Sequence, residues 1–216
     1  MNGTRRWFGA LVGTSVLSTA GCLGFIRGDE SLAFEAGETS VPDEVLSETG
    51  YELVETDRPT ITETFEVADQ TREVEVTNDV SEYQRAVDLG PLGKHEAAVF
   101  VTFATPKVEI LTRTFNPVGD MDNAELAEQL QSEYDDFSIG STVDERTLSV
   151  LDDDVEVTKF EGEATLSEGT DVDVYVHLGT AEHEDDFVVV LGAYPTQLDG
   201  EEDRFDQLAE SVEHEE

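Results

Sequence analysis

The side chain with the most distinctive chemistry in this sequence is the thiol of Cys22, the only cysteine among 216 residues. The small residues Ala20 and Gly21 come directly before it. A cysteine thiol can form a thioether to a glycerol that carries two acyl or alkyl chains, and two chains hold a protein stably on a membrane. We therefore predict that Cys22 is a lipidation site. A single cysteine also excludes a disulfide within the chain.

The segment before Cys22 has the order of an export signal: positive charges, then a short apolar run, then small residues. Arg5 and Arg6 supply the charges. Glycine, serine and threonine interrupt the apolar run, which is shorter than a permanent transmembrane helix requires. The sequence TRRWF around Arg5 and Arg6 resembles the twin-arginine export motif. The sequence TAGC, which ends at Cys22, resembles a lipobox in which Thr19 replaces the usual large aliphatic residue.

The rest of the chain shows no pattern of a transition-metal site or of nucleophilic catalysis. No two histidines are three or four residues apart, and no His-Glu-x-x-His, Gly-x-Ser-x-Gly or phosphate-loop motif is present. From the sequence we expect His95 and His183 in loops and His214 in an acidic tail. We expect His177 on the polar side of a strand. We predict no metal site, no catalytic residue and no cofactor.

Carboxylates gather in three short clusters, Asp152–Asp154, Glu182–Asp186 and Glu201–Asp203. Such loops can bind Ca²⁺, but none has the spacing of an EF-hand, and we expect solvated acidic surfaces. Two alternatives stay open. One is a hydrolase that uses carboxylates alone, which requires a buried acid with a raised pKa inside a cleft. The other is a structural domain stabilised by calcium.

The net charge of −39, from 51 acidic and 12 basic residues, restricts the partners of the protein. A phosphate-binding surface needs clustered lysine and arginine, so we exclude nucleic acid. The acids recur from Asp29 to Glu216, and 38% of the residues are hydrophobic, which argues against a disordered acidic chain. At about 1 M salt the Debye length is roughly 3 Å, so repulsion among carboxylates is screened. This pattern resembles extracellular proteins of halophilic archaea.

Hydrophobic periodicity predicts the elements of the domain. Residues 61–67 and 74–77 alternate as a hairpin does, while residues 97–103 and 187–191 are apolar runs typical of buried strands. Asp122 and Glu125 form the N-terminal signature of one amphipathic helix. A second amphipathic helix has Phe205, Leu208, Ala209 and Val212 on one face. We predict an α+β fold, a mostly antiparallel sheet packed by two amphipathic helices.

We expect three parts: an export signal over residues 1–21, a lipidated cysteine and flexible tether over residues 22–48, and one domain over residues 49–214. The order of elements in the domain looks like that of the PsbP/Mog1-type fold. The whole chain resembles haloarchaeal lipoproteins of unknown function, through Thr4-Arg5-Arg6, Ala20-Gly21-Cys22-Leu23-Gly24, Glu48-Thr49-Gly50-Tyr51-Glu52, Phe115-Asn116-Pro117-Val118-Gly119-Asp120-Met121 and Val157-Thr158-Lys159-Phe160.

That resemblance implies a location and an anchor but no activity. We expect an extracytoplasmic lipoprotein held on the outer face of the cell membrane by lipid on Cys22. We expect it to be a non-enzymatic binding or assembly module, whose further partner is another cell-surface protein or a small ligand.

Overall fold

The computed structural model describes residues 32–215, except residues 68–69, 89, 91–92, 111–112, 115, 134–136 and 166–169. The predicted export signal, with Arg5 and Arg6, and the predicted lipidation site Cys22 lie outside the described residues. Among the described residues, no helix is both long and apolar enough to cross a membrane.

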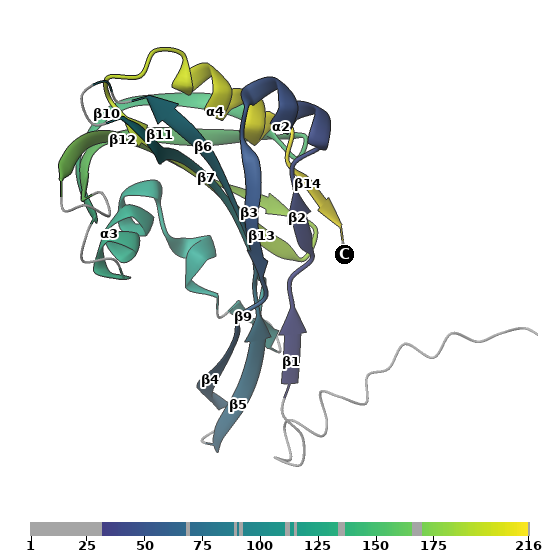
Figure 1. Ribbon diagram of the computed structural model, residues 1–216. Helices are drawn as coiled ribbons and strands as arrows, with labels where there is room; N and C mark the ends of the chain where they lie inside the picture. The colour runs from purple at the N-terminus through teal and green to yellow at the C-terminus, as the bar shows by residue number, and fades with distance from the viewer. Residues whose placement is uncertain are drawn as a thin grey trace, which may run out of the picture.

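A seven-stranded sheet, antiparallel throughout, forms the centre of the domain (Figure 1). Its spatial order is β10-β11-β12-β13-β7-β6-β3. The strands are β3 (Glu52–Asp57), β6 (Asp79–Asp88), β7 (Lys94–Pro106), β10 (Phe137–Val150), β11 (Asp153–Thr165), β12 (Asp171–His183) and β13 (Asp186–Pro195). The apolar runs predicted as buried strands are parts of β7 and β13, which pair with each other at the middle of the sheet.

Helices cover both faces of the sheet (Figure 1). Helices α2 (Asp43–Thr49) and α4 (Glu201–Glu210) pack against each other, and α4 contacts β7, β10 and β13. The larger core lies beneath them and includes Tyr83, Phe100, Phe205 and Leu208. Helix α3 (Asn123–Glu133) covers the opposite face over a smaller core around Phe160 and Leu178. The prediction of an antiparallel α+β fold with two amphipathic helices is confirmed, and α2 is a third helix.

Short strands extend the domain beyond the central sheet. Strand β1 (Leu32–Glu35) runs parallel to β5 (Gln70–Thr77), which pairs antiparallel with β4 (Thr60–Val67). Strand β2 (Glu38–Ser40) pairs antiparallel with the C-terminal β14 (Glu213–Glu215), as seen near the C-terminus in Figure 1. The connection from β7 to α3 contains β8 (Glu109–Ile110), β9 (Arg113–Thr114) and the 3₁₀-helix η2 (Pro117–Asp120).

We expected a flexible tether over residues 22–48 and a domain from residue 49, but the described fold already begins at Leu32. Residues 32–48 contain β1, β2 and most of α2, and they bury Ala36, Val41 and Leu46 in the core. These elements are short, so their hydrophobic pattern is weak in the sequence. Helix α2 ends at Gly50, whose φ of 77° is the left-handed conformation that glycine adopts readily.

The predicted N-terminal signature of α3 is confirmed by its hydrogen bonds. The Asp122 carboxylate accepts hydrogen bonds from the Ala124 and Glu125 amides, each at 2.9 Å. The Glu125 carboxylate accepts one from the Asp122 amide at 3.1 Å. These reciprocal bonds satisfy amides that have no partner within the helix.

Candidate functional site

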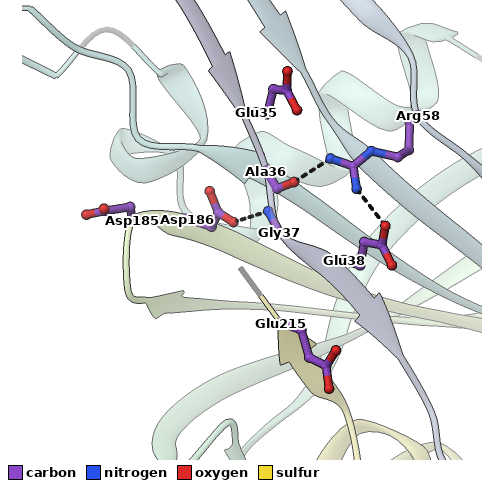
Figure 2. A pocket seen from close by; sticks show the side chains of 8 residues that line it. All are labelled: Glu35, Ala36, Gly37, Glu38, Arg58, Asp185, Asp186 and Glu215. Atoms are coloured by element: carbon purple, nitrogen blue, oxygen red, sulfur yellow. Dashed lines mark hydrogen bonds and ion pairs between the residues drawn. The ribbon is translucent and has the colours of Figure 1, made fainter.

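The turn between β12 and β13 lies at the centre of a polar region of the domain. It carries the predicted acidic cluster Glu182–Asp186, and three pockets adjoin it. Figure 2 shows the first, of about 440 Å³, lined by Glu35, Ala36, Gly37, Glu38, Arg58, Asp185, Asp186 and Glu215. Because five of these eight residues are acidic, the pocket favours a positively charged occupant.

Asp186 is the buried centre of this region, with 4% of its surface exposed. Its Oδ2 accepts a hydrogen bond from the Gly37 amide at 2.7 Å, the dashed line in Figure 2. The same oxygen lies 2.8 Å from Nε2 of His214, whose side chain is fully buried. Asp186 therefore joins the β12–β13 turn to the segment before β2 and to the C-terminal β14.

Two histidines meet beside Asp186. His183 is the last residue of β12, and its Nδ1 lies 3.2 Å from Nδ1 of His214. The two rings are nearly perpendicular, at 86°. The pairing of β14 with β2, with His214 opposite Thr39, holds His214 in this place. Together with Glu184, the two histidines offer ligand atoms that all lie within 4.8 Å of one another.

Sequence reasoning missed this cluster. We expected His183 in a loop and His214 in an acidic tail, but both belong to strands. They are 31 residues apart, so no local spacing rule could connect them. Only the pairing of β2 with β14 brings them together. The other histidine predicted in a loop, His95, belongs to β7.

A pocket of about 390 Å³ lies next to the two histidines. Its lining includes both of them and four acids, Asp152, Glu210, Glu213 and Glu215. Asp152 belongs to the two-residue turn between β10 and β11, where Leu151 and Asp152 have φ angles of 53° and 67°. Positive φ at both central residues is typical of a tight hairpin turn. One of the predicted acidic clusters therefore contributes to the surroundings of the histidines.

Lys107 contacts the β12–β13 turn through both its side chain and its backbone. Its Nζ donates to the backbone oxygen of Glu184 at 2.6 Å and forms an ion pair with Glu182 at 3.0 Å. Its amide donates to the backbone oxygen of Asp185 at 2.7 Å. These contacts fix the backbone of Glu184, whose φ of 51° is rare for a residue other than glycine.

The third predicted acidic cluster starts α4, and its first member is not solvated as we expected. Glu201 is fully buried and forms ion pairs with Arg85 and with Arg204, the latter at 2.8 Å. The Tyr51 hydroxyl donates to it at 3.2 Å. Burial and the neighbouring Glu201 carboxylate raise the pKa of Tyr51 well above its usual range. Burial is tolerated because two guanidinium groups compensate the charge.

Ion pairs hold α4 on the sheet along its length. Arg85 of β6 pairs with Glu201, Lys159 of β11 pairs with Glu202, and Arg146 of β10 pairs with Asp206. The Lys159 ammonium also lies 4.1 Å from the centre of the Tyr175 ring. The described cations on this face therefore have a structural role.

His177 is a core residue, although we expected it on the polar side of a strand. It is fully buried and stacks between the rings of Tyr194 and Phe205, at 5.3 and 4.7 Å between ring centres. Burial, with smaller contributions from Arg146 and Lys159, lowers the pKa of His177 to about 3. Its environment favours the neutral imidazole and a packing role.

The fold and these contacts define an acidic α+β domain with a polar region around Asp186, His183 and His214. The chain belongs to the family described as a domain of unknown function, DUF6517, which it matches over residues 38–213. No curated protein matches the chain. The matched segment begins with the first residue of β2 and ends with the first residue of β14.

Proposed function

We propose that this protein is a lipoprotein anchored on the extracellular face of a halophile's cell membrane, where it serves as a non-enzymatic binding or assembly module. The observation that carries the proposal is the position of Cys22. It is the only cysteine, and it directly follows small residues at the end of a segment that begins with Arg5 and Arg6.

The arrangement of the chain supports this proposal. The described domain begins at Leu32, shortly after Cys22, and β1 and β2 tie that end of the chain into the fold. A lipid on Cys22 would therefore attach to a domain that begins almost at the anchor. The resemblance to haloarchaeal lipoproteins, and that of the element order to the PsbP/Mog1-type fold, belong to the same proposal.

The chemistry of the polar region supports binding of a positively charged partner. Around Asp186, carboxylates outnumber the single guanidinium of Arg58. That guanidinium is itself engaged by Glu38 at 3.2 Å and by the Ala36 carbonyl at 2.8 Å, as Figure 2 shows. The electrostatic potential of such a pocket attracts cations and basic segments of other surface proteins, and it repels anions.

Mass spectrometry of the protein from native membranes tests the anchor. We expect an N-terminus at Cys22 with the added mass of two hydrocarbon chains, and release of the Cys22→Ser variant from the membrane fraction. Ser141→Cys, which places a new thiol on exposed β10, is the matched control in the Cys22→Ser background. It should not restore attachment. An unmodified Cys22, or retention of residues 1–21, would overturn the proposal.

Protease treatment of intact cells tests the side of the membrane. We expect the domain to be removed from intact cells as fully as from lysed cells. Protection in intact cells, with cleavage only after lysis, would place the domain on the other side.

A further inference from the structure

We propose that His183, His214 and Glu184 form a binding site for one divalent transition-metal ion of the zinc class. This inference goes beyond the proposed function and does not depend on the lipid anchor. It rests on the geometry of three side chains from two strands and one turn.

The distance between the two imidazole nitrogens matches a shared metal ion. Nδ1 of His183 and Nδ1 of His214 are 3.2 Å apart. Zinc binds histidine nitrogen at about 2.0–2.1 Å in a tetrahedral arrangement, which places two such nitrogens about 3.3 Å apart. The separation of the two nitrogens therefore suits one ion that contacts both.

Asp186 prepares His214 to be a ligand. An ionised carboxylate only accepts hydrogen bonds, so Nε2 of His214 is the donor in the 2.8 Å contact with Asp186. In the neutral imidazole, Nδ1 then has a free electron pair, and it is Nδ1 that faces His183. A carboxylate behind the ligating histidine is the usual outer partner at metal sites, because it fixes the tautomer and the ring orientation.

The absence of a side chain at Gly37 makes room for the His214 ring. A Cβ atom on Gly37 would lie 2.6 Å from Nε2 of His214, so the ring occupies the space of a missing side chain. The Gly37 amide also holds Asp186 at 2.7 Å. The glycine, the carboxylate and the imidazole therefore form a rigid support behind the proposed site.

Glu184 completes the ligand set. One of its carboxylate oxygens lies within 4.8 Å of one ring nitrogen of each histidine, and Glu184 is exposed. Two imidazoles and one carboxylate suit Zn²⁺, Co²⁺, Ni²⁺ and Fe²⁺, whereas Ca²⁺ and Mg²⁺ prefer oxygen alone. Three protein ligands leave a coordination position for water or a further ligand.

The surrounding charge favours a cation at this place. Four acids line the adjoining pocket, Asp152, Glu210, Glu213 and Glu215. The simpler explanation of the contact is one hydrogen bond, in which His183 donates from Nδ1 to Nδ1 of His214. The two explanations differ in whether the pair takes up metal.

Metal binding by the full chain in molar KCl separates them. One portion of the chelator-stripped protein is dialysed against Zn²⁺ in a large excess of Mg²⁺, and a second metal-free portion is titrated with Co²⁺ in the visible range. Mg²⁺ occupies surface carboxylates but competes poorly for imidazole. We expect one equivalent of Zn²⁺ to remain and Co²⁺ to give absorption bands of nitrogen ligation. Loss of all Zn²⁺ in excess Mg²⁺ would overturn the proposal.

Substitutions assign the ligands. His183→Ala, His214→Gln and Glu184→Gln should each weaken Zn²⁺ binding at least about tenfold, the lower end of what the loss of one partner around a metal costs. The His214→Gln variant is chosen because its side-chain amide can still donate to Asp186. Glu128→Gln removes the same charge from exposed α3 and should change nothing. Unchanged binding by His183→Ala would overturn the proposal, even if His214→Gln fails to fold.

The Cys22→Ser variant separates this inference from the proposed function. A thiolate is also a zinc ligand, so a free Cys22 could bind the ion by itself. We expect Cys22→Ser to bind Zn²⁺ as the unaltered protein does, whether or not Cys22 carries lipid. Loss of the bound equivalent in Cys22→Ser would overturn the site, while the membrane attachment would be judged separately.

Discussion

Arg146 donates a hydrogen bond from Nη1 to Nδ1 of His177 over 3.1 Å. A guanidinium has only donors, so Nδ1 of His177 must be the nitrogen without hydrogen. Nε2 then carries the hydrogen and donates to the Tyr194 hydroxyl at 2.9 Å. The contacts therefore require a neutral imidazole of one tautomer in the centre of the core.

We predict that His177 makes the fold less stable in acid. Its pKa of about 3 in the folded protein lies below the ordinary value of 6.5, so the unfolded chain takes up a proton first as the pH falls. Stability therefore falls from pH 6.5 towards pH 3, by at most about 1.4 kcal/mol per pH unit for one proton. Above pH 6.5 this histidine contributes no pH dependence.

Urea unfolding in molar KCl between pH 7.5 and 5.5 measures this slope before most carboxylates titrate. His177→Gln should flatten the slope, whereas His95→Gln, a histidine of β7, serves as the matched control. An NMR signal of the His177 ring that titrates near pH 6.5 in the folded protein would contradict the prediction.

Glu201→Gln should destabilise the domain by about 3 kcal/mol, because it leaves Arg85 and Arg204 without their buried counter-charge. Urea unfolding at neutral pH gives the free energy. Glu38→Gln is the control. The Glu38 side chain, which pairs with Arg58, is 75% exposed, so this substitution should cost less than about 1 kcal/mol of unfolding free energy. Equal losses of unfolding free energy in the two variants would mean that the burial of Glu201 does not increase the cost of removing its charge.

Gly37→Ala should destabilise the β2–β14 pair and weaken Zn²⁺ binding. The new methyl group would lie 2.6 Å from both Nε2 of His214 and the Glu215 carbonyl oxygen, so β14 must move away. Hydrogen exchange of the Glu213–Glu215 amides reports the movement. Ser40→Ala, an exposed change in β2, should leave exchange and binding unchanged. Normal β14 protection in Gly37→Ala would contradict the geometry described for this glycine.

The domain should become more stable as salt rises from dilute buffer to molar KCl. Two effects oppose each other: salt weakens the ion pairs that hold α4, and it screens repulsion within a chain of net charge −39. Repulsion dominates because the 51 acidic residues far outnumber the 12 basic residues that could pair with them. Circular dichroism melts at several KCl concentrations measure the outcome. A melting temperature that stays constant or falls with KCl would show that the ion pairs dominate.

Local patterns in the sequence were sufficient for much of the fold. The alternation of residues 61–67 and 74–77 predicted the β4–β5 hairpin, and Asp122 with Glu125 predicted the start of α3. Both signals depend on neighbours within a few residues, so the sequence contains them completely. The sequence also carries the whole argument for Arg5, Arg6 and Cys22, which stays a prediction.

Only the tertiary structure decided which polar side chains are buried and which meet. Glu201 looks like any acid in the first turn of a helix, yet partners 116 and 150 residues away, Arg85 and Tyr51, surround it in the core. His183 and His214 become neighbours only because β14 pairs with β2. Strand pairing across long separations has no local periodicity, so the sequence determined the elements and the register between distant strands determined the site.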